Sequence, residues 1–166
     1  MKLTVTILLL FISFLSFGQR LQDTLLRELK PFDLANNGNL LLLDGNFTIS
    51  DGMGGFTYRL DSRGTFERVD FADIGGNFIS QKGTVRLNSN KQLELVSDKE
   101  TSTFDIFVFD TFAFLVKPAN ISDFQKDFTK AVSSFGKKKV YVIGDETYTV
   151  KFMIAFSLRS KYLVRG

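Results

Sequence analysis

Apolar and polar side chains alternate along most of the segment from residue 40 to residue 116, and short turn sequences interrupt the alternation at regular intervals. A period of two is typical of strands with one buried face, because successive side chains point to opposite sides of a sheet. The strand candidates are about eight in number, and they cover residues 40–43, 47–50, 56–60, 65–71, 78–87, 92–97, 103–109 and 111–116. Asp44-Gly45-Asn46 predicts a tight hairpin between the first two. Short connections between many strands predict an antiparallel meander that closes, or nearly closes, into a barrel.

Two segments have the spacing of helices instead. Residues 20–30 place leucines on one helical face, and Pro31 ends this pattern. Near 122–135 a second helix is predicted, with Ser122 as its cap and Gly136 at its end. Its apolar stripe consists of Phe124, Phe128, Ala131, Val132 and Phe135.

The C-terminal segment is read as a closing hairpin of residues 140–143 and 148–158. Apolar or aromatic side chains occupy every second position from Tyr148 to Leu158, which favours a strand. A helix remains the alternative for 147–158, because nearly every residue from Phe152 to Phe156 is apolar.

The first 18 residues have the three parts of a secretory signal peptide. Lys2 gives the positive start, an apolar run covers 7–15, and Ser16-Phe17-Gly18 places small residues before a cut. We therefore expect cleavage between Gly18 and Gln19, a secreted or periplasmic protein, and one domain over 19–166. An uncleaved anchor helix is the alternative. Beyond the leader, no apolar run is long enough for a transmembrane helix.

The chain contains no Cys and no His, and this limits its chemistry. Disulfides, thiolate nucleophiles, imidazole bases and the usual zinc sites are excluded. No metal or cofactor is therefore predicted. Carboxylates are the remaining strong acids and bases, and the candidates are Glu67, Asp70, Asp73, Asp105 and Asp110. Because such residues at strand ends usually belong to solvated turns, we assign no catalytic residue. For Asp105, inside an apolar segment, we expect a hydrogen-bonded core position.

Residues 51–55, Asp-Gly-Met-Gly-Gly, form the densest glycine cluster. The cluster lacks the Lys-Ser/Thr ending of a phosphate-binding loop and does not begin a helix. A loop between two strands is the preferred interpretation.

Three segments carry a family resemblance: FTYRLDSRGTFERVD at 56–70, QKGTVRLNSNKQLELVSD at 81–98 and FDIFVFDTFAFLVKP at 104–118. In this part the chain resembles the small secreted lipocalin-like (calycin-type) domains of Gram-negative bacteria. The resemblance implies a barrel, and its order of many strands, then a helix, then a last strand matches this chain. Together with the helical spacing, the predicted fold is mainly β: an antiparallel meander closing into a lipocalin-like barrel, with a short N-terminal helix and one helix near 122–135. The resemblance also implies a small apolar ligand and transfers no catalytic residue.

Three functions fit these observations. The first is a binding module for a small apolar or amphipathic ligand, with Phe56, Tyr58, Phe107 and Phe109 as the predicted contacts. The second is a structural or interaction protein of the envelope with a filled barrel, which the many Phe residues favour. The third is a carboxylate-based hydrolase.

Charge suggests one further partner. Residues 117–166 contain 10 basic and 4 acidic side chains, a net formal charge of +6 that includes Lys137-Lys138-Lys139. An anionic envelope surface is a possible partner for such a region, and nucleic acid is not an expected partner of an exported protein.

Overall fold

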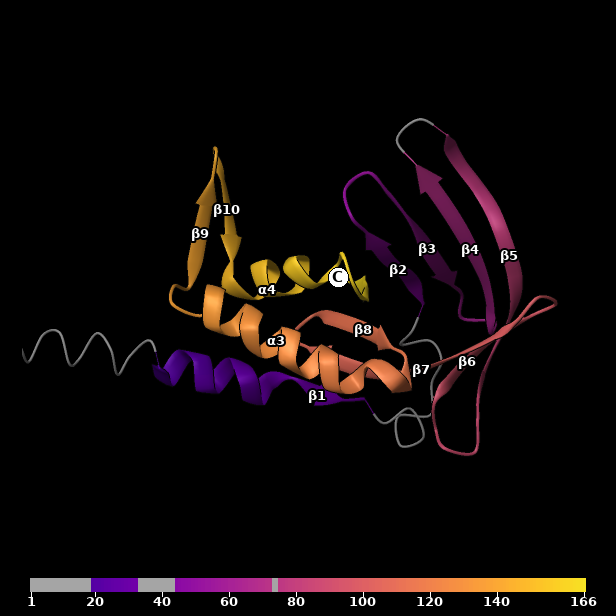
Figure 1. Cartoon of the computed structure of the whole chain (residues 1–166), viewed down its shortest axis with the longest axis horizontal. Helices are drawn as coiled ribbons and strands as arrows, with labels where there is room; N and C mark the ends of the chain where they lie inside the picture. Colours follow the sequence, from indigo (N-terminus) through magenta and orange to yellow (C-terminus); the bar gives the residue numbers. More distant parts are fainter. Residues whose placement is uncertain (1–18, 33–43, 73–74) are drawn as a thin grey trace, which may run out of the picture.

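The computed structural model describes residues 19–32, 44–72 and 75–166. Within these ranges eight antiparallel strands form a closed barrel, which confirms the predicted meander (Figure 1). The barrel strands are β2 (Gly45–Ser50), β3 (Gly54–Leu60), β4 (Thr65–Ala72), β5 (Gly76–Leu87), β6 (Leu93–Ser97), β7 (Thr101–Phe109), β8 (Phe112–Val116) and β11 (Leu163–Arg165). Neighbours in sequence pair from β2 to β8, and β11 closes the ring between β8 and β2. A two-residue strand, β1 (Lys30–Pro31), pairs with the end of β7.

The prediction that Asp44-Gly45-Asn46 forms the turn of a hairpin is wrong. Gly45 and Asn46 already belong to β2, where they pair with Leu60 and Arg59 of β3. The partner predicted for this hairpin, 40–43, lies outside the described residues.

Helices cover one side of the barrel. Residues 19–28 are helical, as predicted, and Leu25 is fully buried against the other helices. Helix α3 (Ile121–Phe135) follows a 3₁₀ turn, η2 (Pro118–Asn120), and Gly136 ends it. Ser122 does not cap α3, because the helix begins one residue earlier and its N-cap residue, Asn120, makes no side-chain cap bond. None of the helices in the described ranges is long and apolar enough to cross a membrane.

The C-terminal segment differs from the predicted closing hairpin. β9 (Val140–Ile143) and β10 (Glu146–Thr149) pair only with each other, as a separate two-stranded sheet. From Val150 to Leu158 the chain is a helix, α4, so the strand preferred for this part was wrong and the helical alternative is correct. Thr149 starts α4, since its side-chain oxygen accepts a hydrogen bond of 3.2 Å from the Phe152 amide. The short strand β11, between β8 and β2, closes the barrel instead.

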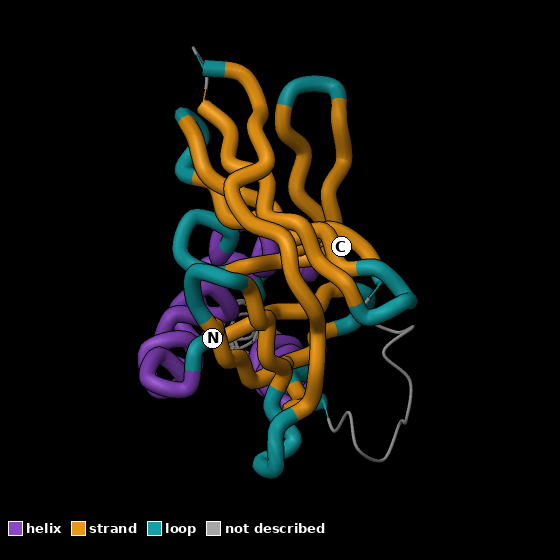
Figure 2. Tube along the Cα trace, turned by 90° about the vertical axis from the view of Figure 1, so that its right-hand side faces the viewer, coloured by secondary structure: helices purple, strands orange, loops and turns teal. Residues whose placement is uncertain are grey.

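The wall formed by β7 and β8 separates two apolar cores. Phe104 and Ile106 of β7 point into the barrel, where they pack in the barrel core. Phe107 and Phe109 point outwards, into a helix-side core that contains Phe124 and other residues of the three helices. Figure 2 shows the strands of the barrel in front and the helices behind them. Every second side chain of this wall is thus inside the barrel, and the others anchor the helices.

Candidate functional site

The four aromatic residues predicted as ligand contacts lie on opposite faces of the barrel wall. Phe56 and Tyr58 of β3 face the interior. Phe107 and Phe109 face the helices, where their ring centroids lie 5.1 Å from Phe124 and 5.0 Å from Phe128, respectively. The structure therefore brings Phe56 and Tyr58 together at one site, and it places Phe107 and Phe109 elsewhere.

A cavity of about 400 Å³ opens at one end of the barrel. This volume is within the range of about 300–1,000 Å³ that is common for small-molecule sites. Its walls are formed by Ile49, Phe56, Tyr58, Arg68, Glu100, Ser102, Phe104, Leu115, Lys117, Asn120, Lys161, Tyr162 and Leu163. Below this cavity the interior is occupied by buried side chains, among them Phe47, Leu60, Phe66, Leu93 and Leu95. The interior is filled at one end and hollow at the other.

Tyr58 is the centre of the cavity's aromatic wall. Only 3% of the residue is exposed, and its ring makes edge-to-face contacts with Phe56 at 5.4 Å, Phe66 at 5.7 Å and Phe104 at 6.1 Å. Such contacts hold rings in fixed orientations. Burial raises the pKa of Tyr58, and this effect outweighs the opposing charge of Arg68 and a hydrogen bond with Ser102. The hydroxyl is therefore a neutral donor and acceptor inside the cavity.

An ion pair from β4 also points into the barrel mouth. Arg68 of β4 lies opposite Tyr58 of β3 in the strand register. Its Nη2 lies 2.9 Å from Oδ1 of Asp70. The two side chains are only 26% and 21% exposed. The guanidinium carbon of Arg68 lies 4.0 Å from the centroid of the Phe56 ring, in the position of a cation–π contact. This pair holds a positive charge against the aromatic wall.

Two more cations stand on the rim. Lys161 donates a hydrogen bond of 3.0 Å to Asp127, and the Tyr162 hydroxyl donates one of 3.1 Å to the same carboxylate oxygen. Burial, followed by this contact with Asp127, raises the pKa of Tyr162 to about 12.

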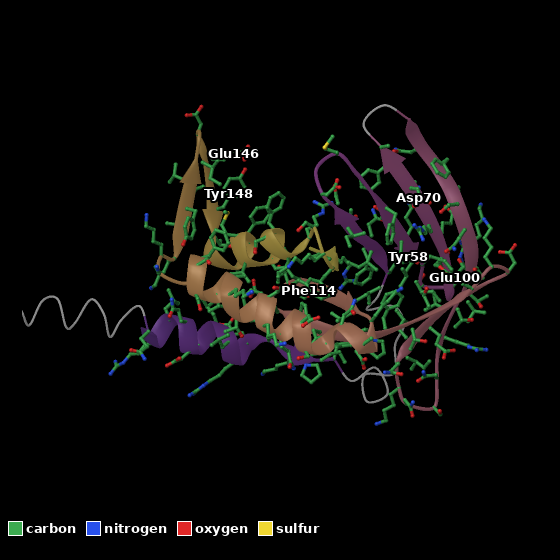
Figure 3. All side chains as sticks on the ribbon, in the orientation of Figure 1. Tyr58, Asp70, Glu100, Phe114, Glu146 and Tyr148 are labelled. Atoms are coloured by element: carbon green, nitrogen blue, oxygen red, sulfur yellow. The ribbon has the colours of Figure 1, made fainter. Side chains whose placement is uncertain are left out.

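Lys117 is exposed, and no described residue forms a hydrogen bond or ion pair with its side chain. With Glu100 as the one acidic side chain in its lining, the cavity is more basic than acidic. Figure 3 shows Tyr58 and Glu100 in the barrel half of the molecule, remote from Tyr148 and Glu146 on the β9–β10 hairpin.

The carboxylates considered for hydrolysis each have a different neighbour. Glu67 pairs with Lys82 at 2.8 Å, Asp70 pairs with Arg68, and Asp110 pairs with Lys151 at 3.0 Å. Asp73 lies outside the described residues. In the described ranges there is also no cluster of three acidic side chains that fits a metal ion.

Asp105 has the hydrogen bond that the sequence predicted. Its Oδ2 accepts from the Gln92 side chain at 3.1 Å. The residue is half-buried, however, and does not belong to the core.

The glycine cluster begins as a turn between β2 and β3, as expected, and its last two residues, Gly54 and Gly55, already belong to β3. Asp51 Oδ1 accepts hydrogen bonds from the amides of Met53 at 2.9 Å and Gly54 at 3.0 Å, and these bonds lower the pKa of Asp51. The amides that would hold an external anion therefore already bind a carboxylate of the loop itself. Gly55 is required here, because a Cβ would lie 2.1 Å from the carbonyl oxygen of Ile49.

Sequence reasoning missed Arg68, Lys117, Lys161 and Tyr162 as cavity residues. A signal existed for Arg68, since it is two residues after the apolar Phe66 and so shares its face. The other three residues come from the connections next to β8 and β11, and no local pattern places these connections beside β3.

Comparisons with protein-family models, with curated proteins and with solved structures found no match to this chain. What the structure establishes is a closed eight-stranded antiparallel barrel, the architecture that the lipocalin-like resemblance implied.

Proposed function

We propose that this protein is an exported binding module that holds a small amphipathic molecule in the cavity at the mouth of its barrel. The observation that supports this most is the cavity itself: about 400 Å³, with an aromatic inner wall and a basic rim. A cavity with apolar walls and a few polar groups at its opening is the usual form of a small-molecule site. The lipocalin-like resemblance and the leader-like residues 1–18 support the binding role and the export, respectively.

The lining indicates the orientation of the ligand. Phe56, Phe104 and Leu115 offer apolar contact to its body at the inner end. Lys117 stands at the outer end, and no described partner neutralises it. The ligand would thus place its apolar part towards Tyr58 and a polar or anionic group near Lys117.

Native mass spectrometry of protein purified from its own envelope tests the proposal. We expect a reproducible co-purifying apolar molecule, and we expect members of a panel of fatty acids and isoprenoids to raise the melting temperature. Ligand-free protein with no thermal shift from the panel would contradict the proposal. That result would favour the alternative hypothesis, in which the barrel serves as an interaction scaffold.

Two matched variants locate the binding. Ser102 is 9% exposed and lines the cavity, so Ser102→Leu should fill the space and abolish the mass adduct. Ser134→Leu, on the exposed side of α3, should leave the adduct unchanged. Loss of the adduct in both variants, or in neither, would contradict a site in the cavity.

A second candidate role is contact with an anionic envelope surface. Lys137, Lys138 and Lys139 are all exposed, and they precede the exposed apolar side chains of Val140 and Val142 in β9. Reversal of the three lysines to Glu should reduce binding to anionic liposomes, with an effect that weakens as salt is added. Equal binding by the variant would remove this role.

A further inference from the structure

Three aromatic rings form a continuous stack that runs from the end of β10 onto α4. Phe152 and Phe156 are four residues apart on one side of the helix, and Tyr148 of β10 stacks on Phe152. The centroids of Tyr148 and Phe152 are 5.0 Å apart and those of Phe152 and Phe156 are 5.6 Å apart, with interplanar angles of 22° and 15°. Phe156 is 57% exposed, and in the described ranges its ring contacts no other ring than Phe152. The stack therefore ends in an uncovered aromatic face.

Arg159 is nearly one turn further along the chain. Its Nε atom is buried and has no hydrogen-bond partner, and no described residue forms an ion pair with its guanidinium. Buried donors in native proteins almost always have partners, so an unpaired one needs an explanation. The two Nη groups of Arg159 are not among the buried atoms and form no hydrogen bond with a described residue, so they are the donors that an acceptor group of a ligand can reach.

Two adjoining hollows meet at Phe156 and Arg159. The first, of about 370 Å³, lies between α4 and the outer face of the barrel and is also lined by Asn46, Thr48, Phe112, Phe152, Ala155, Val164 and Gly166. The second is lined also by Ser50, Asp51, Gly52, Phe71, Ser157 and Ser160. Asp51 is the acidic side chain in these linings, and its Oδ1 already accepts two backbone amides. Among the side chains of these linings, Arg159 is thus the charge available to a ligand.

The barrel wall separates these hollows from the cavity at the barrel mouth. Thr48 and Val164 line the first hollow, whereas the adjacent residues Ile49 and Leu163 line the cavity. Neighbouring residues in β2 and β11 point to opposite faces, so the two spaces lie on opposite sides of the same strands. Figure 1 shows α4 between the β9–β10 hairpin and β2, outside the barrel.

We propose that this face of α4 is a second binding site, specific for a small planar aromatic carboxylate. The ring of the ligand stacks on the free face of Phe156 and continues the aromatic stack. The carboxylate binds Arg159, whose planar guanidinium matches a carboxylate with two parallel hydrogen bonds. Phe156 and Arg159 each line both hollows, so a ligand in either hollow meets an aromatic ring and a positive charge. Binding therefore requires both the ring and the carboxylate of the ligand.

The test uses 2-naphthoate as the probe. The chain has no Trp, so the fluorescence of the naphthyl group is read without indole background. We expect saturable binding to the full chain, and we expect Arg159→Gln and Phe156→Ser each to weaken it about tenfold or more. Arg159→Lys should restore only part of the affinity, since Lys lacks the planar fork.

Matched controls separate this site from general effects. Phe78→Ser changes another ring that is 62% exposed, and Arg63→Gln changes an arginine that is 86% exposed; neither should alter binding. Ser102→Leu, which fills the barrel cavity, should also leave naphthoate binding unchanged. Two ligand controls use the unmodified protein and measure displacement of bound naphthoate: neutral 2-naphthalenemethanol and the ringless decanoate should both displace it with constants at least about tenfold weaker than the dissociation constant of naphthoate itself. Absence of naphthoate binding, unchanged binding to Arg159→Gln, or displacement by decanoate with a constant equal to that of naphthoate would each overturn the proposal.

Discussion

The guanidinium of Arg68 lies over the ring of Phe56, 4.0 Å from its centroid, and its Nη2 forms an ion pair of 2.9 Å with Oδ1 of Asp70. The three side chains come from neighbouring strands, since Phe56 is paired with Asp70 in the β3–β4 ladder. An inward-facing ion pair thus fixes one aromatic wall of the cavity.

Removal of the positive charge at this wall should destabilise the protein. Arg68→Met keeps an unbranched apolar side chain over Phe56 but leaves the Asp70 carboxylate half-buried and unpaired. We expect a loss of about 1–3 kcal/mol in the free energy of unfolding, measured by urea denaturation. Asp70→Asn in the same protein should restore part of this loss, because it removes the orphaned charge. Strictly additive losses in the double variant would mean that the two side chains do not interact.

The packing of α3 on the barrel depends on Phe128. This ring is 1% exposed and contacts Phe109 edge to face at 5.0 Å. Phe128→Ala should therefore lower the free energy of unfolding by about 3–5 kcal/mol, while Phe78→Ala, at an exposed ring, should change it by less than about 1 kcal/mol. Similar losses in both variants would show that α3 is not anchored as described.

Tyr162 should make stability depend on pH in the alkaline range. Burial and the hydrogen bond to Asp127 raise its pKa from 10.0 to about 12, so the folded protein holds this proton more tightly than the unfolded chain does. The resulting stabilisation is complete below pH 10 and is lost as the pH rises to about 12. Denaturation curves over this range should show a smaller alkaline loss in Tyr162→Phe than in the unmodified protein. An identical pH dependence in both would contradict the shifted pKa.

Processing of the leader has its own measurement. We expect the intact mass of protein recovered from the cell envelope or medium to correspond to a chain that starts at Gln19. Lys2, the apolar run over 7–15 and Ser16-Phe17-Gly18 are the basis of this expectation. Recovery of a chain with Met1 from a membrane fraction would favour the anchor helix instead.

The barrel was predictable because its strands are half-buried. In β3, Phe56, Tyr58 and Leu60 alternate with polar residues, so the sequence of this strand shows the period of two. The same rule could not say which residues of β7 face the cavity. Ile106 and Phe107 are both buried, one in the barrel and the other against the helices, and alternation carries no information where both faces are apolar.

The C-terminal segment shows a second limit of pattern reasoning. Apolar residues fill both faces of α4, since Ile154 and Ala155 are buried whereas Phe152 and Phe156 form the exposed stack, and this mixture also fits a strand. Thr149 was the available signal, as a capping residue just before the apolar run. β11, with only three residues, is too short for any period to be recognised.

Fluorine NMR of protein labelled with 3-fluorotyrosine tests the central claim most directly. The chain has four tyrosines: Tyr58 and Tyr162 line the barrel cavity, while Tyr141 and Tyr148 lie on the β9–β10 hairpin. Each signal can be assigned with a Tyr→Phe variant, and Figure 3 shows how far Tyr58 lies from Tyr148. If the cavity holds the ligand, addition of the co-purifying molecule or of a fatty acid that raises the melting temperature should shift the Tyr58 and Tyr162 signals and leave the hairpin signals in place. Unchanged Tyr58 and Tyr162 signals at a saturating ligand concentration would contradict a binding site at the mouth of the barrel.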